Sequence, residues 1–543
     1  MEAEAIESVS APPVSRGEWL LIAALFLLAF LPVVQTANDY GWTYDEPHYL
    51  SAGAAYGEWW TRLARGDRSV ARPEAILECW RLNHEHPPLQ KSASGLAQRW
   101  FGAGGVEPKD ARLPSALWFA LTTCAIYLFC RGVWGRRGAL FAALAFLTLP
   151  RVMAHAHFAA LDMPIAAWFF ITAALTAEAM GRDSWSWVWL SGLAFGLALL
   201  SKINAFFLPP LLFLWGLGWH RTSWPRLVFA FLMVGPAVFI LGWPWLWVDP
   251  IAHLREYLAF HSGHAAYNVW YLGKLYQYAP WHYPLVMIGI TTPVAVLALS
   301  LGGVARSLPR RSWEARRALL LLGLAIAVAP SALPESPKYN GVRLFLPAFP
   351  FLAALAGGGF AWLQLRLVTL LRATTPARRR LSALVCTALG ALLLYPGVRG
   401  ATDTHPYQLA YYNELVGGAA KATAAGCETI YWGQVFQAAP EFLNQVPEER
   451  PRVLVIPKGV IYLLTAQQGP GALREEIRFT GDEQAASEVD YVMFQCMQSE
   501  FSDLCWALTR EAEPAWAARL EGVPLLVAYD RETVASVLAR RQR

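Results

Sequence analysis

The composition of this chain excludes an ordinary soluble enzyme. It has 543 residues, of which 55% are hydrophobic and 16% charged, and its mean hydropathy is +0.31. A soluble fold of this size could not cover that much apolar surface, so we expect a membrane protein. The net charge of +5 comes largely from arginines in a few short connections. Such clustering is a signal of membrane topology, and we expect no nucleic-acid partner.

The apolar residues fall into about eleven runs that approach the roughly 20 residues a bilayer requires. These candidate spans are 19–36, 113–131, 138–150, 164–180, 187–201, 203–219, 227–244, 283–305, 318–333, 344–365 and 381–398. Several are short and could be tilted, paired or re-entrant. The first run is too long for a secretory signal and its leader is acidic, which favours a retained anchor.

The arginine-rich connections predict the orientation of the spans. They lie at 131–137, 181–183, 220–226, 306–317 and 366–380, and alternate connections share one side of the membrane. The positive-inside rule makes that side cytoplasmic, together with a tail at residues 1–17. The first loop, 37–112, a second loop, 245–281, and everything after Arg399 are then external. We expect a protein of the bacterial plasma (inner) membrane.

The last segment, 399–543, changes character and predicts a soluble α/β domain on the outer face. Strand-length apolar runs occur at 452–457, 489–494 and 524–530, and a helix is expected at 511–520. No nucleotide-binding glycine loop or Ser-His-Asp signature occurs in it. Four cysteines are expected outside the membrane, and their three possible pairings stay open; they are Cys79, Cys427, Cys496 and Cys505.

Adjacent carboxylates follow the first apolar run, in the aromatic-rich stretch 40–51. Asp45 and Glu46 either begin a surface helix as N-terminal acids, with Pro47 in its first turn, or deliver catalytic carboxylates to the membrane surface. Asp162 presents the same choice, since it either caps a helix or serves as a second site acid. Two histidines, His155 and His157, precede it.

Glu85 and His86 lie where the first loop returns to the membrane, just before Pro87-Pro88. This pair is either a hydrogen-bonded structural pair in a stiff loop or part of a metal site. A divalent ion could bridge such side chains to a phosphate, but mixed carboxylate and imidazole ligands do not identify the metal.

Three cations are expected at the outer membrane boundary. Lys202 closes the fifth apolar run, and Lys338 and Arg343 precede the tenth. Each either anchors the chain at the interface or contacts a lipid phosphate, for which a guanidinium offers a bidentate fork.

The order of these motifs resembles the membrane glycosyltransferases of the C superfamily (GT-C), and within them glycosyltransferase family 39, which includes protein O-mannosyltransferases and lipid A aminoarabinose transferases. The motifs are Asp-Glu after the first span, His-Pro-Pro-Leu before the second, Leu-Asp-Met-Pro before the fourth and Gly-Leu-Ala-Leu-Leu-Ser-Lys closing the fifth. The resemblance covers residues 18 to about 400. It implies a GT-C catalytic domain at 18–398 that moves a sugar from a polyprenyl-phosphate carrier to a hydroxyl of a protein, glycan or lipid, with inversion, at the outer face.

By this resemblance Asp45 matches the family's essential acid and Glu46 accompanies it. Glu85 and His86 match an acid and its polar partner, and the resemblance leaves open whether His86 binds the donor phosphate or a metal. Asp162 matches a second acid and Lys202 a phosphate-contacting lysine; Arg343 is a looser match. Two further stretches, 405–418 and Tyr431-Trp-Gly433, resemble bacterial members without an assigned role.

The residues alone suit this chemistry, because glycosyl transfer needs a base for the acceptor proton and cations for the leaving phosphate. Asp45 is the expected base, and Asp162 would orient the acceptor or favour positive charge on the sugar. Two alternatives stay open. A transporter would also bury acids and lysines, although in broken helices at mid-span rather than in boundary loops. A non-catalytic scaffold would tolerate loss of Asp45.

Overall fold

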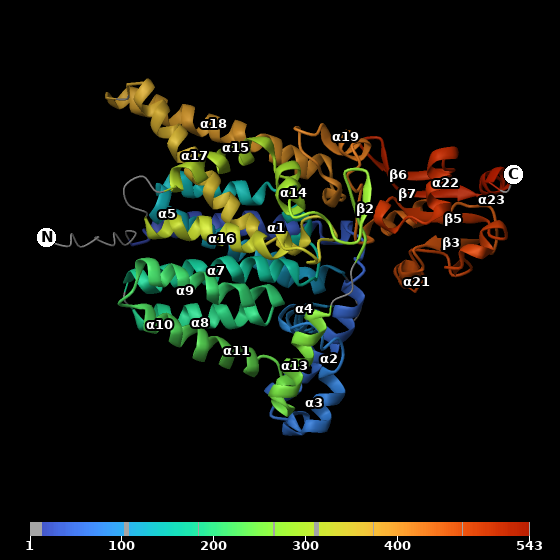
Figure 1. The fold of residues 1–543 in the computed structure, drawn as a ribbon, viewed down its shortest axis with the longest axis horizontal. Coiled ribbons are helices and arrows are strands. Elements are labelled where there is room, and N and C mark those ends of the chain that lie inside the picture. Colours follow the sequence, from blue (N-terminus) through green and yellow to red (C-terminus); the bar gives the residue numbers. More distant parts are fainter. Residues whose placement is uncertain are drawn as a thin grey trace.

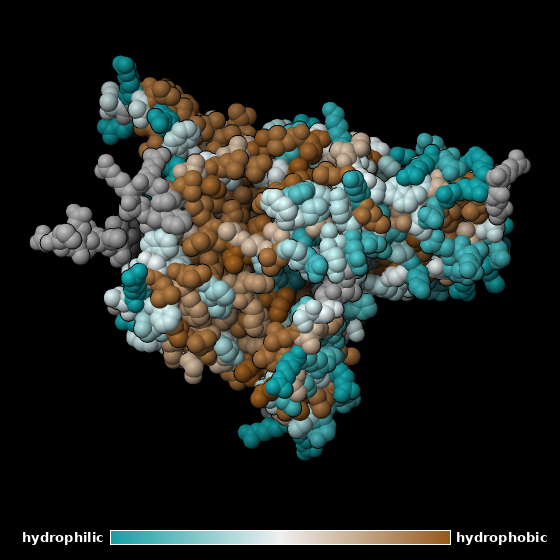
Figure 2. Space-filling model, viewed as in Figure 1, coloured by the Kyte–Doolittle hydropathy of each residue, from teal (hydrophilic) through white to brown (hydrophobic). Residues whose placement is uncertain are grey.

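The computed structural model describes residues 13–102, 108–182, 184–263, 267–308, 314–372, 374–469 and 471–541. It consists of a long helical bundle with a five-stranded sheet domain at one end (Figure 1). Large apolar side chains lie exposed along the bundle, whereas the sheet domain is mostly polar (Figure 2). Such a continuous apolar surface marks the bundle as the part that meets lipid. Most of the predicted tail at 1–17 and part of the arginine connection at 306–317 lie outside the described residues.

Within the described residues, seven helical segments are long and apolar enough to cross a membrane. They are α1 (Arg16–Gln35), α5 (Pro108–Leu147), α7 (Asp162–Arg182), α10 with α11 (Trp224–Phe229 and Gly235–Leu241), α16 (Ala315–Ala332), α17 (Ala348–Leu370) and α18 (Pro376–Asp403). Shorter apolar helices are α8 (Trp185–Leu199), η3 with α9 (Ile203–Phe207 and Leu208–Trp219) and α15 (Val294–Ser307). Every predicted apolar run falls on helix, which confirms a polytopic helical fold, and the count of eleven spans stays a prediction.

Two helix breaks have local causes. Helix α5 contains Gly135 in a left-handed conformation (φ 74°), so it consists of two helical pieces, as the two separate apolar runs predict. The predicted span 283–305 is interrupted at Thr292-Pro293, between α14 (Tyr283–Thr291) and α15. Proline cannot continue the hydrogen-bond ladder of the preceding helix, so the chain bends there.

The first predicted loop is itself helical. It contains α2 (Glu46–Ala64), α3 (Pro73–Trp80) and α4 (Leu89–Phe101), and α6 (Pro150–Ala156) follows α5. Helices α2 and α4 meet backbone to backbone, because a Cβ on Gly95 would lie 1.8 Å from the carbonyl oxygen of Gly53. Glycines at this contact therefore allow the middle of α2 to pack closely against the middle of α4. The second predicted loop carries α12 (Trp245–Val248), α13 (Pro250–Ser262) and a hairpin of β1 (Val269–Tyr271) and β2 (Lys274–Tyr276).

The C-terminal sheet has strand order β4-β3-β5-β7-β6, with β3 parallel to both neighbours and the other pairs antiparallel. Its strands are β3 (Arg452–Ile456), β4 (Arg478–Thr480), β5 (Tyr491–Gln495), β6 (Trp516–Leu520) and β7 (Val523–Asp530). The accompanying helices are α19 (Gly418–Ala424), α20 (Ala439–Leu443), α21 (Ile461–Gln468), α22 (Asp503–Glu511) and α23 (Arg531–Arg541). All three predicted strands are confirmed.

The helix predicted at 511–520 is wrong. Helix α22 ends at Glu511, and residues 516–520 form the edge strand β6 against β7. Pro514 separates the two elements, and pairing with β7 outweighs the helical preference of the alanines that follow. The seven cysteines all lie in described residues and are unpaired, so none of the three open pairings forms.

Candidate active site

A cavity of about 750 Å³ lies between the bundle and the C-terminal region. We call it the central cavity. Of the predicted site residues, Asp45, His86, Lys202 and Arg343 line it. Residues of the C-terminal region also line it, among them Trp432, Tyr462 and Glu500. Side chains that are far apart in the sequence therefore converge on one space.

The predicted acids and cations form one ion network at the wall of the central cavity. Asp162 lies just behind the wall, fully buried, and bridges two cations. Its Oδ2 accepts a hydrogen bond from Arg343 Nε at 2.9 Å, and its Oδ1 accepts one from Lys202 Nζ at 2.6 Å. Arg343 Nη2 also donates to Oδ2 of Asp45. Two carboxylates and two cations thus share one compact cluster.

Each member of the network sits where an element begins or turns. Asp45 immediately precedes α2, Asp162 opens α7, Lys202 lies between α8 and η3, and Arg343 opens the short helix η5 (Arg343–Phe345). The Asp45 side chain makes no capping hydrogen bond. Both Asp162 oxygens bind cations instead. The capping alternative therefore does not describe the contacts of either acid.

The two cations respond differently to burial. Burial lowers the pKa of the Lys202 ammonium, and the neighbouring Asp162 opposes that shift. Burial would also lower the pKa of Arg343, but Asp162 and Asp45 together raise it well above its ordinary value. Arg343 is thus a permanent positive charge facing the cavity, suited to an anionic ligand.

Glu46 is corrected by the structure. It is fully buried, pairs with Arg112 at 2.8 and 2.9 Å, and accepts the backbone N–H groups of Thr43 and Ala159 at 2.9 and 2.8 Å. It does not line the central cavity. All of its acceptor capacity is used inside the protein, where its contacts hold the chain around Asp45.

Lys338 and Glu85 also point elsewhere. Lys338 Nζ donates to the carbonyl oxygens of Leu333 and Ser336 at 2.7 and 3.2 Å, and Glu85 accepts a hydrogen bond from Asn83 at 2.6 Å. Neither lines the central cavity. Both therefore act as anchors of their own loops, which leaves Lys338 outside the phosphate-binding set.

His86 reaches the cavity but is not a cation. Burial and the nearby Lys91 lower its pKa well below the ordinary range, so the imidazole is neutral. Its Nδ1 has no hydrogen-bond partner. Among the residues that the structure describes, no group of three His, Cys, Asp or Glu could hold a metal ion. Glu85 and His86 therefore gain no third metal ligand of these types within the described residues.

Sequence reasoning missed the contribution of the C-terminal region. The indole Nε1 of Trp432 donates to Asp45 Oδ2 at 3.2 Å, across 387 residues of sequence. The same ring faces the guanidinium carbon of Arg343 at 4.3 Å. The only sequence feature that pointed to this region was the stretch Tyr431-Trp-Gly433. No sequence pattern predicts that this stretch lies beside Asp45 and Arg343.

One segment of the chain matches a known protein family. Residues 85–247, about a third of the chain, match the model of the dolichyl-phosphate-mannose-protein mannosyltransferase family. No curated protein matches the chain.

Solved structures give weaker likenesses. ArnT from Cupriavidus metallidurans bound to undecaprenyl phosphate is 19% identical, with 96% of this chain and 99% of that chain covered and a TM-score of 0.48. Its apo form is 18% identical, with 95% of this chain and 98% of that chain covered and a TM-score of 0.49. The Archaeoglobus fulgidus oligosaccharyltransferase with a tethered acceptor peptide is 13% identical, with 96% of this chain and 72% of that chain covered and a TM-score of 0.46. At such identities and scores these likenesses establish neither activity nor substrate.

The matched segment contains His86, Asp162 and Lys202 and spans α4 to α12. It thus includes three of the motifs on which the resemblance was drawn, and the resemblance is confirmed at the level of family. Over residues 85–247 the chain is similar to the dolichyl-phosphate-mannose-protein mannosyltransferase family.

Proposed function

We propose that this protein is an inverting glycosyltransferase that moves a sugar from a polyprenyl-phosphate carrier to a hydroxyl acceptor. The observation that carries the proposal is the ion network of Asp45, Asp162, Lys202 and Arg343 at the wall of the central cavity. The family of residues 85–247 carries a polyprenyl-type phosphate donor in its description, which supports the same reading.

Asp45 is the proposed general base. Its Oδ2 is held by Arg343 and Trp432, whereas its Oδ1 makes no hydrogen bond within the described residues. Oδ1 would take the proton of the acceptor hydroxyl as that oxygen bonds to the anomeric carbon. The bond from this carbon to the carrier phosphate breaks in the same step, and polyprenyl phosphate leaves. Attack from the side opposite the phosphate inverts the configuration.

Lys202 and Arg343 are the proposed phosphate clamp. Negative charge grows on the phosphate as its bond to the sugar breaks, and buried cations aimed at that charge stabilise the transition state. Asp162 holds both cations in place through its two oxygens. Because Asp162 already balances part of their charge, the clamp can release the product phosphate.

The two sides of the cavity suggest where each substrate lies. Apolar residues line the side nearest the bundle, among them Phe207, Leu333 and Leu344, and would accommodate the prenyl chain. Tyr462 and Glu500 of the C-terminal region line the other side, where the acceptor would enter. This matches a membrane domain at 18–398 with a C-terminal domain at 399–543 that selects the acceptor. We place that domain outside a bacterial plasma membrane, with the N-terminus in the cytoplasm.

The test uses purified protein in lipid, a panel of labelled polyprenyl-phosphate sugars, and a membrane extract that supplies protein, glycan and lipid acceptors. We expect one donor to give a labelled adduct. Asp45→Asn should abolish the adduct, and its matched control is Asp39→Asn, because Asp39 lies in the same loop but pairs with His405 outside the cavity. No adduct from any donor would overturn the proposal, and carrier movement across the bilayer without an adduct would indicate a transporter.

A further inference from the structure

Trp432 has a backbone conformation that bulky side chains rarely adopt. Its φ is +77°, and Gly433 after it has φ +82°. The left-handed region is unfavourable for a residue with a Cβ, so the surroundings must hold it there. The backbone N–H of Tyr44 donates to the Trp432 carbonyl at 3.1 Å. A Cβ on Gly433 would lie 2.1 Å from the Tyr44 ring. The turn 431–433 is therefore seated against the residue that precedes Asp45.

The Trp432 side chain touches both halves of the ion network. It is fully buried, its N–H binds Asp45 Oδ2, and its ring covers the Arg343 guanidinium. His155 packs against the ring with 5.2 Å between the centroids. Burial lowers the pKa of His155 to about 3, so this neighbour is neutral and adds no charge to compete for Asp45.

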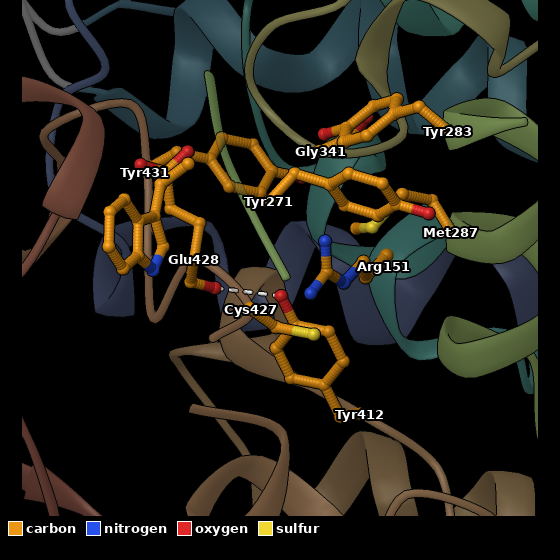
Figure 3. A pocket seen from close by; sticks show the side chains of 10 residues that line it. Arg151, Tyr271, Tyr283, Met287, Gly341, Tyr412, Cys427, Glu428 and Tyr431 are labelled. Atoms are coloured by element: carbon orange, nitrogen blue, oxygen red, sulfur yellow. Dashed lines mark hydrogen bonds between the residues drawn. The ribbon is translucent and has the colours of Figure 1, made fainter. Parts of the chain in front are cut away.

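A second cluster fixes the turn relative to the loop that carries Arg343. The guanidinium of Arg151 lies 4.6 Å from the ring of Tyr412 and 5.7 Å from that of Tyr431 (Figure 3). A Cβ on Gly341 would lie 2.7 Å from Arg151 Nη1 and 2.5 Å from Tyr431. Arg151 and Tyr431 therefore pack closely against the backbone two residues before Arg343, with no space for a side chain on Gly341.

We propose that Trp432 is a positioning residue for the transfer reaction, and that the C-terminal region completes the active site through it. This inference rests on the proposed function. The indole N–H occupies Oδ2 of Asp45 and so directs Oδ1 toward the acceptor. The ring holds Arg343 against the cavity wall, where the carrier phosphate would bind. Trp432 itself need not touch either substrate to act in this way.

Two substitutions separate these roles. Trp432→Phe keeps a ring over Arg343 and removes the N–H, whereas Trp432→Ala removes both. A hydrogen bond to a charged group typically contributes about 1.5–3 kcal/mol, so Trp432→Phe should lower kcat at least tenfold. Its affinity for undecaprenyl phosphate should stay within twofold, because the N–H acts on the base alone. Trp432→Ala should lower kcat further and weaken undecaprenyl phosphate binding about three- to tenfold, since the cation–π contact is lost.

Trp516→Phe is the matched control, because Trp516 stacks on Phe442 in the sheet domain and lies outside the cavity. Turnover with the donor used by the wild type, undecaprenyl phosphate affinity and melting temperature are measured for all three variants. Trp432→Phe that turns over like Trp516→Phe would overturn the inference, as would a loss that only tracks melting temperature.

Failure of the inference and failure of the proposed function look different. If the wild type neither binds undecaprenyl phosphate nor forms an adduct, the proposed function fails. If the wild type is active and Trp432→Phe is equally active, only the role of Trp432 fails. Should Trp432→Ala not fold, the Phe variant decides.

Discussion

Asp45 and Glu46 are neighbours in sequence, and each pairs with an arginine, yet they belong to two different kinds of ion cluster. The Glu46–Arg112 pair is sealed: both side chains are at most 1% exposed, and backbone groups fill the remaining acceptor positions. The Asp45–Arg343 pair borders the central cavity, and the Asp45 side chain is 29% exposed.

The difference shows that an acid–arginine pair does not by itself reveal a reactive site. A sealed pair has no spare acceptor atom and no path for a ligand, so it can only hold the fold together. A pair with an unused oxygen and an adjoining cavity can bind and exchange protons. The contrast predicts that equivalent substitutions on the two sides fail in different ways.

Asp45→Asn should have the largest effect. An amide cannot take the acceptor proton, so turnover should fall about 10²- to 10⁴-fold. The melting temperature should stay close to that of the wild type, because the Asp45 pair is partly exposed. Initial rates and thermal unfolding are measured in parallel, with Asp39→Asn as the control. Full activity in Asp45→Asn would show that Asp45 is not the base. It would also contradict the proposed difference between the Asp45–Arg343 and Glu46–Arg112 pairs.

Glu46→Gln should act through stability. Removing one partner of a sealed pair leaves the Arg112 charge uncompensated, at a cost of roughly 3–5 kcal/mol. We expect a lower melting temperature and less folded protein, whereas the folded fraction should keep its turnover per molecule. Glu58→Gln on the same helix is the control, since its pair with Arg99 is exposed. A stable but inactive Glu46→Gln would return Glu46 to the catalytic set.

Lys202→Met should weaken the phosphate clamp. The methionine fills similar space but cannot donate to the phosphate, so we expect undecaprenyl phosphate affinity to fall roughly tenfold. Titration of the purified variants measures this, with Lys274→Met in the exposed hairpin as the control. Unchanged affinity would make Lys202 only a partner of Asp162.

The last expected effect is a pH dependence of stability near Arg151. Burial raises the pKa of Glu428 from 4.5 to about 7, so the folded protein favours its neutral form. This contribution is complete below pH 4.5 and is lost as the pH rises through about 7. The melting temperature of the wild type relative to Glu428→Gln should therefore fall between pH 4.5 and 7 and then level off. Glu441→Gln is the control variant, and its melting temperature relative to the wild type should not change over the same pH range.

Much of the fold could be predicted because its signals are local. A run of apolar residues long enough for a bilayer forms helix, since only a helix satisfies all backbone groups within a single segment in lipid. Strands β3, β5 and β7 follow from short apolar runs. The edge strand β6 was missed because its alanine-rich sequence favours helix, and only pairing with β7 makes it a strand.

The site was predictable as a set of residue types but not as an arrangement. Asp45, Asp162, Lys202 and Arg343 could be selected because charged side chains at a membrane boundary need a partner or a ligand. The sequence could not predict that Glu46 turns inward to Arg112 while Asp45 turns toward the cavity. Both directions suit the same local sequence.

The sequence by itself determined that this chain is a helical membrane protein with a β-containing C-terminal region, and it singled out most of the charged residues of the site. Hydrophobic length and the spacing of charged motifs carry that information along the chain. Only the tertiary structure decided which of two adjacent acids faces the cavity and that Trp432 completes the cluster. Those outcomes depend on contacts between segments hundreds of residues apart. A local sequence pattern contains no information on the free energies of such contacts.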